Sequence, residues 1–312
     1  MTISQRQLLY FTEVVEAGSF SRAAKAIGVA QSALSHQISE LETLLGTRLL
    51  ERRARGTVTT PAGERLYGHA KSITSAFSNA EFDVRTFSQR PTGRVTVVMA
   101  HPVVDPLTLP FVKALRERLP DVQIALHEYI STAAVERVLS GLSDFALVYD
   151  PAPDPRIEAI PVIEEELFLV GVKELIGDST TPVTLSSLKH APVLPPRPPR
   201  HHRALKKRQM LRDRVQANEW IEVDSHSAVR QMAVMGVACS ILTRASVAPE
   251  LRSGQLHSRP IRNPSILWTL HLLWSVERPR TKAFIAVRDL LLAVIREEVL
   301  AARWPARDLM DV

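Results

Sequence analysis

Short hydrogen-bonding side chains gather on one face of a predicted helix near the start of this 312-residue chain. Within residues 31–45, Leu and Ile recur at helical spacing and form an apolar face, which consists of Leu34, Ile38, Leu41 and Leu45. The polar side chains lie away from that face: Gln31, Ser32, Ser35, His36 and Ser39. Short polar side chains on a helix held from behind can reach base edges in the major groove of DNA. A solvated helix face in an ordinary bundle is the alternative.

A second predicted helix and a basic segment flank this one. The preceding helix is expected to open at Ser21 as N-cap and to end at Gly28, and its Ala23 and Ala24 allow close approach of a neighbouring helix. Arginines follow the end of the second helix at Gly46, where a phosphate backbone would lie: Arg48, Arg52, Arg53 and Arg55. The combination favours a helix-turn-helix that binds DNA.

Residues 54–60 are short, β-branched and polar, so we expect a small hairpin, or wing, there. Pro61 suits the first turn of a following helix, 61–89. Apolar residues recur along it at heptad spacing: Leu66, Ala70, Ile73, Phe77, Ala80, Val84 and Phe87. Packing on its own domain is one interpretation. We favour a homodimer, because a long seam without a neighbour in the sequence needs a second chain to bury it.

Downstream of a hinge at residues 90–93, predicted strands and helices alternate, which indicates βαβ units and a parallel sheet. A strand at 94–100 is expected to lead into a loop, 101–106, and then a helix from Leu109. After a break at 150–155, a new strand is expected at 166–172. We assign one lobe to 94–164 plus 270–305 and a second to 165–269. Two connections between lobes would form a clamp that holds a small ligand between them.

Composition narrows the function classes. The net charge of +6 and pI near 9.7 favour a polyanionic partner. Cys239 is the only cysteine, so an intramolecular disulfide is impossible and a reducing compartment fits. The sequence shows neither a secretory signal nor an apolar run long enough to span a membrane, which predicts a cytoplasmic location and no membrane partner.

Enzymatic motifs are absent: the sequence contains no GxSxG, Walker loop, GxGxxG or HExxH. We therefore expect no catalytic residue, no cofactor and no enzyme activity. His201 and His202 are adjacent, with His190 and His226 not far off, but adjacent histidines in a Pro/Arg-rich loop favour solvation over a metal site. Cys239 lies among apolar residues and is expected to be an inert buried thiol.

The segment SFSRAAKAIGVAQSALSHQISELETLLGTRLLER, residues 19–52, followed by TTPAGERL, residues 59–66, resembles the DNA-binding segment of LysR-type transcriptional regulators. The residues that match are Ala23, Ala24, Gln31, Ser35, Gln37, Ile38, Leu41, Glu42, Leu45, Gly46, Leu49, Glu51, Arg52, Thr60 and Gly63. Two positions depart from the pattern. His36 stands where Arg is commoner and would alter base readout or phosphate contact, and Thr59 stands where Leu is commoner and would face the core of the wing.

The resemblance implies an α/β protein with an all-α N-terminal part. Its parts are a winged helix-turn-helix at 1–60, a linker and dimerisation helix at 61–89, and a two-lobed effector-binding domain at 94–305 like periplasmic binding proteins. Expected partners are double-stranded DNA, a second chain through the linker helix, a homotetramer, a small-molecule effector and RNA polymerase. The predicted DNA-binding residues are Ser21, Gln31, Ser32, Ser35, His36, Arg52, Arg53, Arg55 and Thr60.

The predicted effector site lies at strand ends and one helix N-terminus, where open α/β sheets and helix dipoles place ligands. Its residues are His101, Pro102, Val103, Ser131, Tyr149, Arg197 and Ser225. In the family, positions matching Ser131 and Tyr149 line the effector cleft. Donors outnumber acids in this set, so we expect a small polar ligand, preferably an anion.

HPVV, residues 101–104, lacks the Ser or Thr that is usual in the family after the first strand. The pocket would then be degenerate and the regulator effector-independent, which is one alternative. A solute-binding module without DNA function, suggested by residues 94–305 alone, is another. LHEYIS, FALVYD and VLPPRP together resemble the branch that includes nitrogen-assimilation control regulators.

Overall fold

The computed structural model describes residues 2–53, 56–85, 90–177, 181–188, 192–194, 223, 225–263 and 265–310, with no side-chain placement for Arg52, Ser75 and residues 78–85. They form two compact units. Unit 1 is Met1–Gly93 with Ser140–Leu142, and unit 2 is Arg94–Leu139 with Ser143–Val312. The sequence also predicts a basic helix at 203–217 and a strand at 220–225. These segments lie outside the described residues apart from Val223 and Ser225, as do the predicted site residues Arg55 and Arg197.

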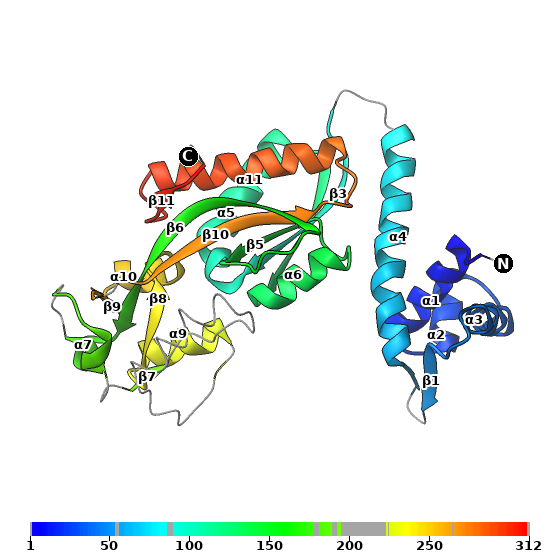
Figure 1. The fold of residues 1–312 in the computed structure, drawn as a ribbon, viewed down its shortest axis with the longest axis horizontal. Helices are drawn as coiled ribbons and strands as arrows, with labels where there is room; N and C mark the ends of the chain where they lie inside the picture. The colour runs from blue at the N-terminus through cyan, green and yellow to red at the C-terminus, as the bar shows by residue number, and fades with distance from the viewer. Residues whose placement is uncertain are drawn as a thin grey trace. The chain divides into compact units, whose positions relative to one another are not determined.

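Unit 1 begins with three helices, α1 (Gln5–Ala17), α2 (Phe20–Ile27) and α3 (Gln31–Leu45), around one apolar core (Figure 1). A capping box of Ser4 and Gln7 starts α1. The prediction that Ser21 caps α2 is wrong, because the helix starts two residues earlier with Ser19 as N-cap. Phe20 is buried, and placing it inside the first turn brings it into the core with Ala23 and Ala24.

The wing consists of β1 (Leu50–Arg53) and β2 (Gly56–Thr59), paired antiparallel with Leu50 opposite Thr59. It therefore begins four residues earlier than predicted, and Arg52 and Arg53 belong to its first strand. The Thr57 amide donates to the Gly18 carbonyl at 2.9 Å, which docks the wing on the end of α1. Gly56 has φ +133°, and a Cβ there would lie 2.6 Å from the Gly18 oxygen, so only glycine fits this approach.

The apolar residues predicted to form a seam along the linker helix α4 (Pro61–Arg85) have two different kinds of surroundings. Ala70 is fully buried in the core of unit 1 and Leu66 packs against that core. Ile73 and Phe77, farther along, are 40% and 47% exposed. The two interpretations of the seam thus apply to different parts of it: its start packs on its own domain, and the next two apolar positions lie open.

Unit 2 contains a nine-stranded mixed sheet in the order β4-β3-β5-β10-β6-β8-β7, with β9 and β11 paired to β6. The strands are β3 (Gly93–Ala100), β4 (Val122–Tyr129), β5 (Phe145–Tyr149), β6 (Ile157–Gly171), β7 (Val193–Leu194), β8 (Cys239–Thr243), β9 (His257–Pro260), β10 (Leu267–Ser275) and β11 (Arg307–Asp308). The expected parallel pairing occurs between β3 and β5 and between β7 and β8. The long strands β6 and β10 instead run antiparallel to each other and to β8 and β5, respectively.

Helices cover both faces of the lobe-one part of this sheet (Figure 1). Val97 and Met99 of β3 face a core shared with α5 (His101–Arg118) and α11 (Lys282–Leu300). Val98, between them, faces α6 (Ser131–Leu139) through Ala134 and Val138. This alternation is the strand period of two, and it fixes the three-layered packing of lobe one, with helices on each face of the sheet.

Two boundaries in unit 2 differ from the sequence prediction. Residues 101–106 form the first turns of α5 instead of a loop, because Pro102 suits the helix N-terminus. Strand β6 starts at Ile157, nine residues before the predicted start at residue 166, and runs through the expected lobe boundary at 164/165. The register between β6 and β10 shifts next to Pro161, and a bulge is where a strand tolerates proline.

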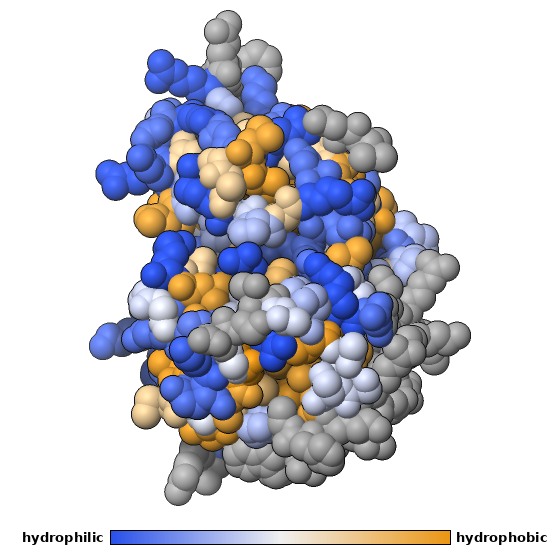
Figure 2. All heavy atoms as spheres, turned by 90° about the vertical axis from the view of Figure 1, so that its left-hand side faces the viewer, coloured by the Kyte–Doolittle hydropathy of each residue, from blue (hydrophilic) through white to orange (hydrophobic). Residues whose placement is uncertain are grey.

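Lobe two is completed by α7 (Lys173–Ile176), the short 3-10 helices η1 (Leu185–Leu188) and η2 (Ala245–Val247), α9 (His226–Val234) and α10 (Ala248–Arg252). Its apolar core includes Leu167, Leu169 and Cys239. Figure 2 views the molecule from the side of α7 and α10, where hydrophilic side chains are interleaved with hydrophobic ones. None of the helices within the described ranges is long and apolar enough to cross a membrane.

Candidate DNA-binding surface and interlobe site

The apolar face of α3 is anchored in unit 1. Leu34, Ile38 and Leu41 are buried, whereas Leu45 is 37% exposed and falls outside the buried face to which the sequence assigned it. On the other side of the helix Gln31, Ser32, His36 and Ser39 are exposed, and Ser35 is partly buried. The structure thus presents the predicted polar face on a helix that is held firmly from behind.

Neighbouring groups orient several of these side chains. The Ser21 hydroxyl donates to Gln31 Oε1 at 2.8 Å, so α2 positions the first polar residue of α3. His36 Nδ1 lies 3.5 Å from Glu40 Oε1, and the His36 side chain is 71% exposed. Glu40 also accepts a hydrogen bond from Gln37 at 2.6 Å. The ring of His36 therefore points to solvent with a carboxylate one helical turn behind it.

Glu42 links α3 to the wing through hydrogen bonds, a role that the sequence does not predict. Its Oε1 accepts hydrogen bonds from the amides of Leu49 and Leu50, at 2.7 and 3.1 Å. It thereby joins the end of α3 to the first strand of the wing. Only its match to the family pattern singled it out, because a lone Glu in a helix carries no signal for a contact seven residues away.

The predicted wing residues have different surroundings. Arg53 is exposed and lies 3.3 Å from Glu51 Oε2. The Thr60 hydroxyl is engaged twice, donating to the Arg48 carbonyl at 2.7 Å and accepting from the Gly63 amide at 3.0 Å. Thr59 does not face a wing core as predicted, because its hydroxyl donates to Glu64. Thr59 and Thr60 thus hold the junction of wing and linker helix.

Only some of the predicted effector residues lie close to one another. His101 is the first residue of α5, and its Nδ1 lies 2.6 Å from Glu128 Oε1 at the end of β4. Pro102 is half-buried beside it, but Val103 is fully buried in the lobe-one core and cannot line a cleft. Ser131 is the half-buried first residue of α6.

Tyr149 is also buried, at 2% exposure, and its hydroxyl donates to Glu165 inside the protein instead of facing a cleft. Glu165 lies on β6 and is 1% exposed. Burial raises the pKa of Glu165 to about 7 despite the hydrogen bond from Tyr149. Burial and the nearby Glu165 raise the pKa of Tyr149 well above its ordinary value. Tyr149, which the sequence analysis assigns to the effector site, therefore forms a buried polar pair with Glu165 at the end of β5.

The second lobe contributes the N-terminus of α9. Ser225 is its N-cap, accepting from the Ala228 amide at 3.3 Å, and its hydroxyl lies 2.9 Å from that of Ser227. Burial lowers the pKa of His226, as does the nearby charge of His101 from lobe one. His226 Nε2 is buried and has no hydrogen-bond partner among the described residues. The starts of α5 and α9 thus meet at the interlobe mouth, which we define as His101, Glu128, Ser225 and His226.

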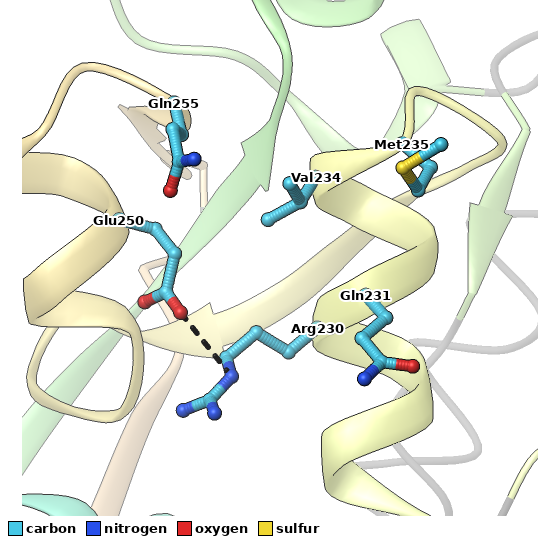
Figure 3. A pocket seen from close by; sticks show the side chains of 6 residues that line it. All are labelled: Arg230, Gln231, Val234, Met235, Glu250 and Gln255. Carbon is cyan, nitrogen blue, oxygen red and sulfur yellow. Dashed lines mark ion pairs between the residues drawn. The ribbon is translucent and has the colours of Figure 1, made fainter.

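One turn farther along each helix, an ion pair joins the lobes. Arg230 Nη1 of α9 lies 2.5 Å from Asp105 Oδ2 of α5. Its Nε lies 3.3 Å from Glu250 Oε1 of α10 (Figure 3). A single guanidinium is thus shared between a carboxylate of each lobe. The sequence does not predict this contact, because its partners are 125 residues apart and no local pattern links them.

The histidines and the single cysteine are the residues to consider for metal binding and thiol reactivity. Within the described ranges, no group of three or more His, Cys, Asp and Glu residues is arranged to hold a metal ion. His190, His201 and His202 lie outside those ranges. Cys239 is buried, and burial raises the pKa of its thiol to about 11, so it stays protonated at neutral pH, as expected for an inert thiol.

Two protein families match the sequence. Residues 5–64 match the family described as "Bacterial regulatory helix-turn-helix protein, lysR family". Residues 88–296 match the family described as "LysR substrate binding domain". Together they cover both the helix-turn-helix and the two-lobed unit.

Similar proteins extend over nearly the whole chain. The nitrogen assimilation regulatory protein nac of Klebsiella aerogenes is 28% identical over 299 residues, which is 96% of this chain and 97% of that protein. The HTH-type transcriptional regulator BbuR of Bordetella bronchiseptica is 28% identical over 95% of this chain and 91% of its own length.

Solved structures share the fold. A full-length OxyR variant from Pseudomonas aeruginosa has a TM-score of 0.70 at 17% identity, covering 95% of both chains. Full-length CbnR in complex with its target DNA has a TM-score of 0.67 at 23% identity, covering 95% of this chain and 99% of CbnR. The predicted architecture is confirmed: a winged helix-turn-helix, a long linker helix and a two-lobed α/β domain.

Proposed function

We propose a function for this chain from the premise that it belongs to the LysR family of bacterial helix-turn-helix regulators. It is a DNA-binding transcriptional regulator with an effector-binding type of domain. The exposed polar face of α3, anchored by Leu34, Ile38 and Leu41, carries the proposal for how it reads DNA. In this proposal, base edges contact Gln31, Ser32, Ser35 and His36, and phosphates contact Arg52, Arg53 and Arg55.

Two predicted contacts have narrower roles in this proposal. Ser21 acts by orienting Gln31, with which it is hydrogen-bonded. Thr60 acts by fixing the wing, because its hydroxyl already bonds Arg48 and Gly63. A change in either residue should therefore affect DNA binding through geometry.

Binding of genomic DNA fragments across a salt series tests the proposal. Ser35→Ala with His36→Ala should relax sequence preference at one or two base pairs, by about 1–3 kcal/mol each. Arg53→Ala should instead weaken binding to all fragments and reduce the salt dependence. Full operator discrimination by the double variant would show that the readout residues are misassigned.

We further propose a homodimer through α4. Its support is the exposure of Ile73 and Phe77 on a long helix, since two large apolar side chains at heptad spacing are typical of a paired seam. A dimer would present two helix-turn-helix units to two half-sites, and two dimers would form a homotetramer. RNA polymerase is a further proposed partner, the cytoplasm the proposed compartment, and enzyme activity is not part of the proposal.

For the two-lobed unit we propose a small polar or anionic effector at the interlobe mouth. Ser225 and the start of α9 support an anion, whereas Glu128 opposes one. Thermal-shift measurements with polar metabolites on wild type and Ser225→Trp, which fills the mouth at an exposed position, test this. A ligand that raises the melting temperature of wild type alone supports the mouth, and equal shifts place the site elsewhere.

An effector-independent regulator is the second candidate. It is favoured by the pairing of His101 with Glu128 and of Asp105 with Arg230, because these groups already satisfy one another. Absence of any thermal shift would support it. The similarity to nac, named as a nitrogen assimilation regulatory protein, supports the proposal that this chain belongs to that branch.

A further inference from the structure

The two lobes of unit 2 are joined by a narrow ribbon of two strands, where β6 and β10 both cross from one lobe to the other (Figure 1). Glu165 and Glu166 of β6 pair with Trp268 and Leu267 of β10, and with no further strand among the described residues. Before this point β6 also pairs with β11, and from Leu167 onward it pairs with β8 and then with β9. Because a ribbon of two strands bends more easily than a wider sheet, the lobes can rotate at this place.

Three consecutive glutamates of β6 occupy this ribbon, and the outer two form ion pairs. Glu164 Oε2 lies 2.8 Å from Arg307 Nη2. Glu166 pairs with Arg262. Because side chains alternate along a strand, Glu165 points to the opposite face, where it is 1% exposed. Its Oε1 is buried and has no hydrogen-bond partner among the described residues, so the middle glutamate differs from both of its neighbours.

Segments of both lobes cover Glu165. From lobe one, Tyr149 of β5 donates to its Oε2, and the fully buried Trp304 lies beside it after the end of α11. From lobe two, the Thr243 hydroxyl at the end of β8 lies within hydrogen-bonding reach of the carboxyl group. Ala245, two residues later, packs against the core of lobe one. Rotation of the lobes at the ribbon would therefore separate Thr243 from Tyr149 and admit water to Glu165.

The described side chains packed on Glu165 carry no charge, because they are a phenol, two indoles and a hydroxyl. The charged residues next to them contact other groups. Asp150 accepts from the Thr269 amide at 3.4 Å, and the Arg244 guanidinium lies over the ring of Phe168. Burial therefore dominates and raises the pKa of Glu165 from 4.5 to about 7. The protonated form favours the covered ribbon, whereas the ionised form is more stable where water can hydrate it.

We propose that Glu165 is a proton-dependent switch in the hinge between the lobes. With its proton, the carboxyl group stays buried and the ribbon keeps the lobes together. When it loses the proton, water enters the ribbon to hydrate the carboxylate and the lobes rotate apart. The two-lobed unit thus responds to pH through its hinge, independently of any effector at the interlobe mouth.

Distances between two spin labels test the switch on the full-length protein. Glu136→Cys on α6 and Gln231→Cys on α9 place the labels at exposed positions of the two lobes, and the buried Cys239 stays unlabelled. Dilution with unlabelled protein removes distances between chains. We expect a longer distance at pH 8 than at pH 5, because opening becomes up to about 300-fold more favourable as the pH rises from 4.5 to about 7. An unchanged distance with native Glu165 in place would overturn the proposal.

Variants of the three glutamates assign the response. Glu165→Gln keeps the shape of the side chain but cannot ionise, so the distance should stay at its pH 5 value at both pH values. Glu164→Gln and Glu166→Gln are the matched controls, because these side chains lie on the other face of the ribbon, and both variants should open with pH as the native protein does. Circular dichroism verifies folding. The same opening in Glu165→Gln would assign the response to other groups and contradict the proposal.

The direction of the change separates Glu165 from the histidines of the interlobe mouth. The charge of His101 acts on His226 across the lobes, so protonation of both at low pH would push the lobes apart. A longer distance at pH 5 than at pH 8 would therefore contradict a hinge controlled by Glu165. None of these measurements involves DNA, so failure here leaves the proposed DNA-binding function standing.

Discussion

The polar side chains of α3 and those of the interlobe mouth differ in what they contact. On α3, Gln31, Ser32 and His36 face solvent, and the apolar face behind them is buried. At the mouth, His101 contacts Glu128, and one turn farther along the helices Asp105 contacts Arg230 from the opposite lobe. The side chains of the first surface are mostly exposed to an outside partner, even though Gln31 accepts a hydrogen bond from Ser21 and His36 lies beside Glu40, whereas those of the second contact one another more closely.

This difference has an energetic consequence. A ligand for α3 displaces water from side chains that are already oriented, so little protein structure has to change. A ligand at the mouth has to displace ion pairs, and it binds only if it replaces their hydrogen bonds. The two-lobed unit is therefore built to respond only to a ligand that competes well with its own side chains.

The largest expected effect concerns the exposed apolar part of α4. Ile73→Asp with Phe77→Asp should weaken dimerisation at least about a hundredfold, because a charge in an apolar seam loses its hydration without gaining a partner. Sedimentation at a series of concentrations measures this. Arg65→Asp, an exposed position of α4 outside the heptad seam, is the control and should stay dimeric.

An unchanged oligomeric state in the folded double variant would refute the α4 seam. Ile73 and Phe77 would then be exposed apolar residues that bind no second chain, and exposure alone would not identify a contact surface on this protein.

The sequence predicts the regions that depend on interactions between neighbouring residues better than those that depend on contacts between distant segments. The helices of unit 1 follow from periodicity and local caps such as Ser4 with Gln7. In unit 2, interpreting Pro102 as a loop residue delays the predicted start of α5, and Pro161 obscures the first half of β6. Proline at a helix N-terminus or a bulge is compatible with regular structure, but only the tertiary context distinguishes these cases.

The sites show the same limit. The α3 surface was predictable because one helix supplies both its buried and its exposed face. Tyr149 was misassigned because a strand end predicts location but not direction, and its side chain points to the buried Glu165. Arg230 was missed because its partners, Asp105 and Glu250, come from distant segments.

The next largest effect concerns Glu165, the buried carboxyl group that pairs with Tyr149. Since the pKa of Glu165 rises from an ordinary 4.5 to about 7, the folded state binds more protons than the unfolded state between these values. Its contribution to stability is therefore full below about pH 4.5 and lost as pH rises to 7, a change of roughly 3 kcal/mol. Urea unfolding at pH 5 and pH 8 should show a flatter pH dependence in Glu165→Gln than in wild type.

Glu128→Gln is the matched control from the mouth, where the carboxylate is half-exposed. Equal pH dependence in wild type and Glu165→Gln would mean that burial does not perturb this carboxyl group.

A smaller effect is expected at Glu42, the engaged carboxylate of unit 1. Glu42→Ala leaves the amides of Leu49 and Leu50 without their acceptor and should lower the free energy of unfolding by about 1–3 kcal/mol. Glu42→Gln keeps an oxygen at this place and should recover much of the loss. Chemical denaturation of both variants measures this, and equal losses in the two would show that the charge matters and the hydrogen bonds do not.

The smallest effects come from two histidines that each lie beside a glutamate. His101 is 2.6 Å from Glu128 with 25% of its side chain exposed, whereas His36 is 3.5 Å from Glu40 with 71% exposed. His101→Ala should cost about 1 kcal/mol of stability, and His36→Ala at most about 0.5 kcal/mol, because solvent screens the more exposed pair. Denaturation curves at equal pH measure both values.

The same two variants should exchange rank when DNA binding is measured. His36→Ala removes a side chain from the proposed reading surface and should change operator discrimination by about 1 kcal/mol or more, while non-specific affinity stays the same. His101→Ala, within the two-lobed unit, should leave discrimination intact. If His101→Ala changes base preference as much as His36→Ala does, the exposed face of α3 does not act alone in readout. The internal pairing at the mouth would then contribute to DNA recognition, and the distinction between an outward surface and a self-contained one would not hold.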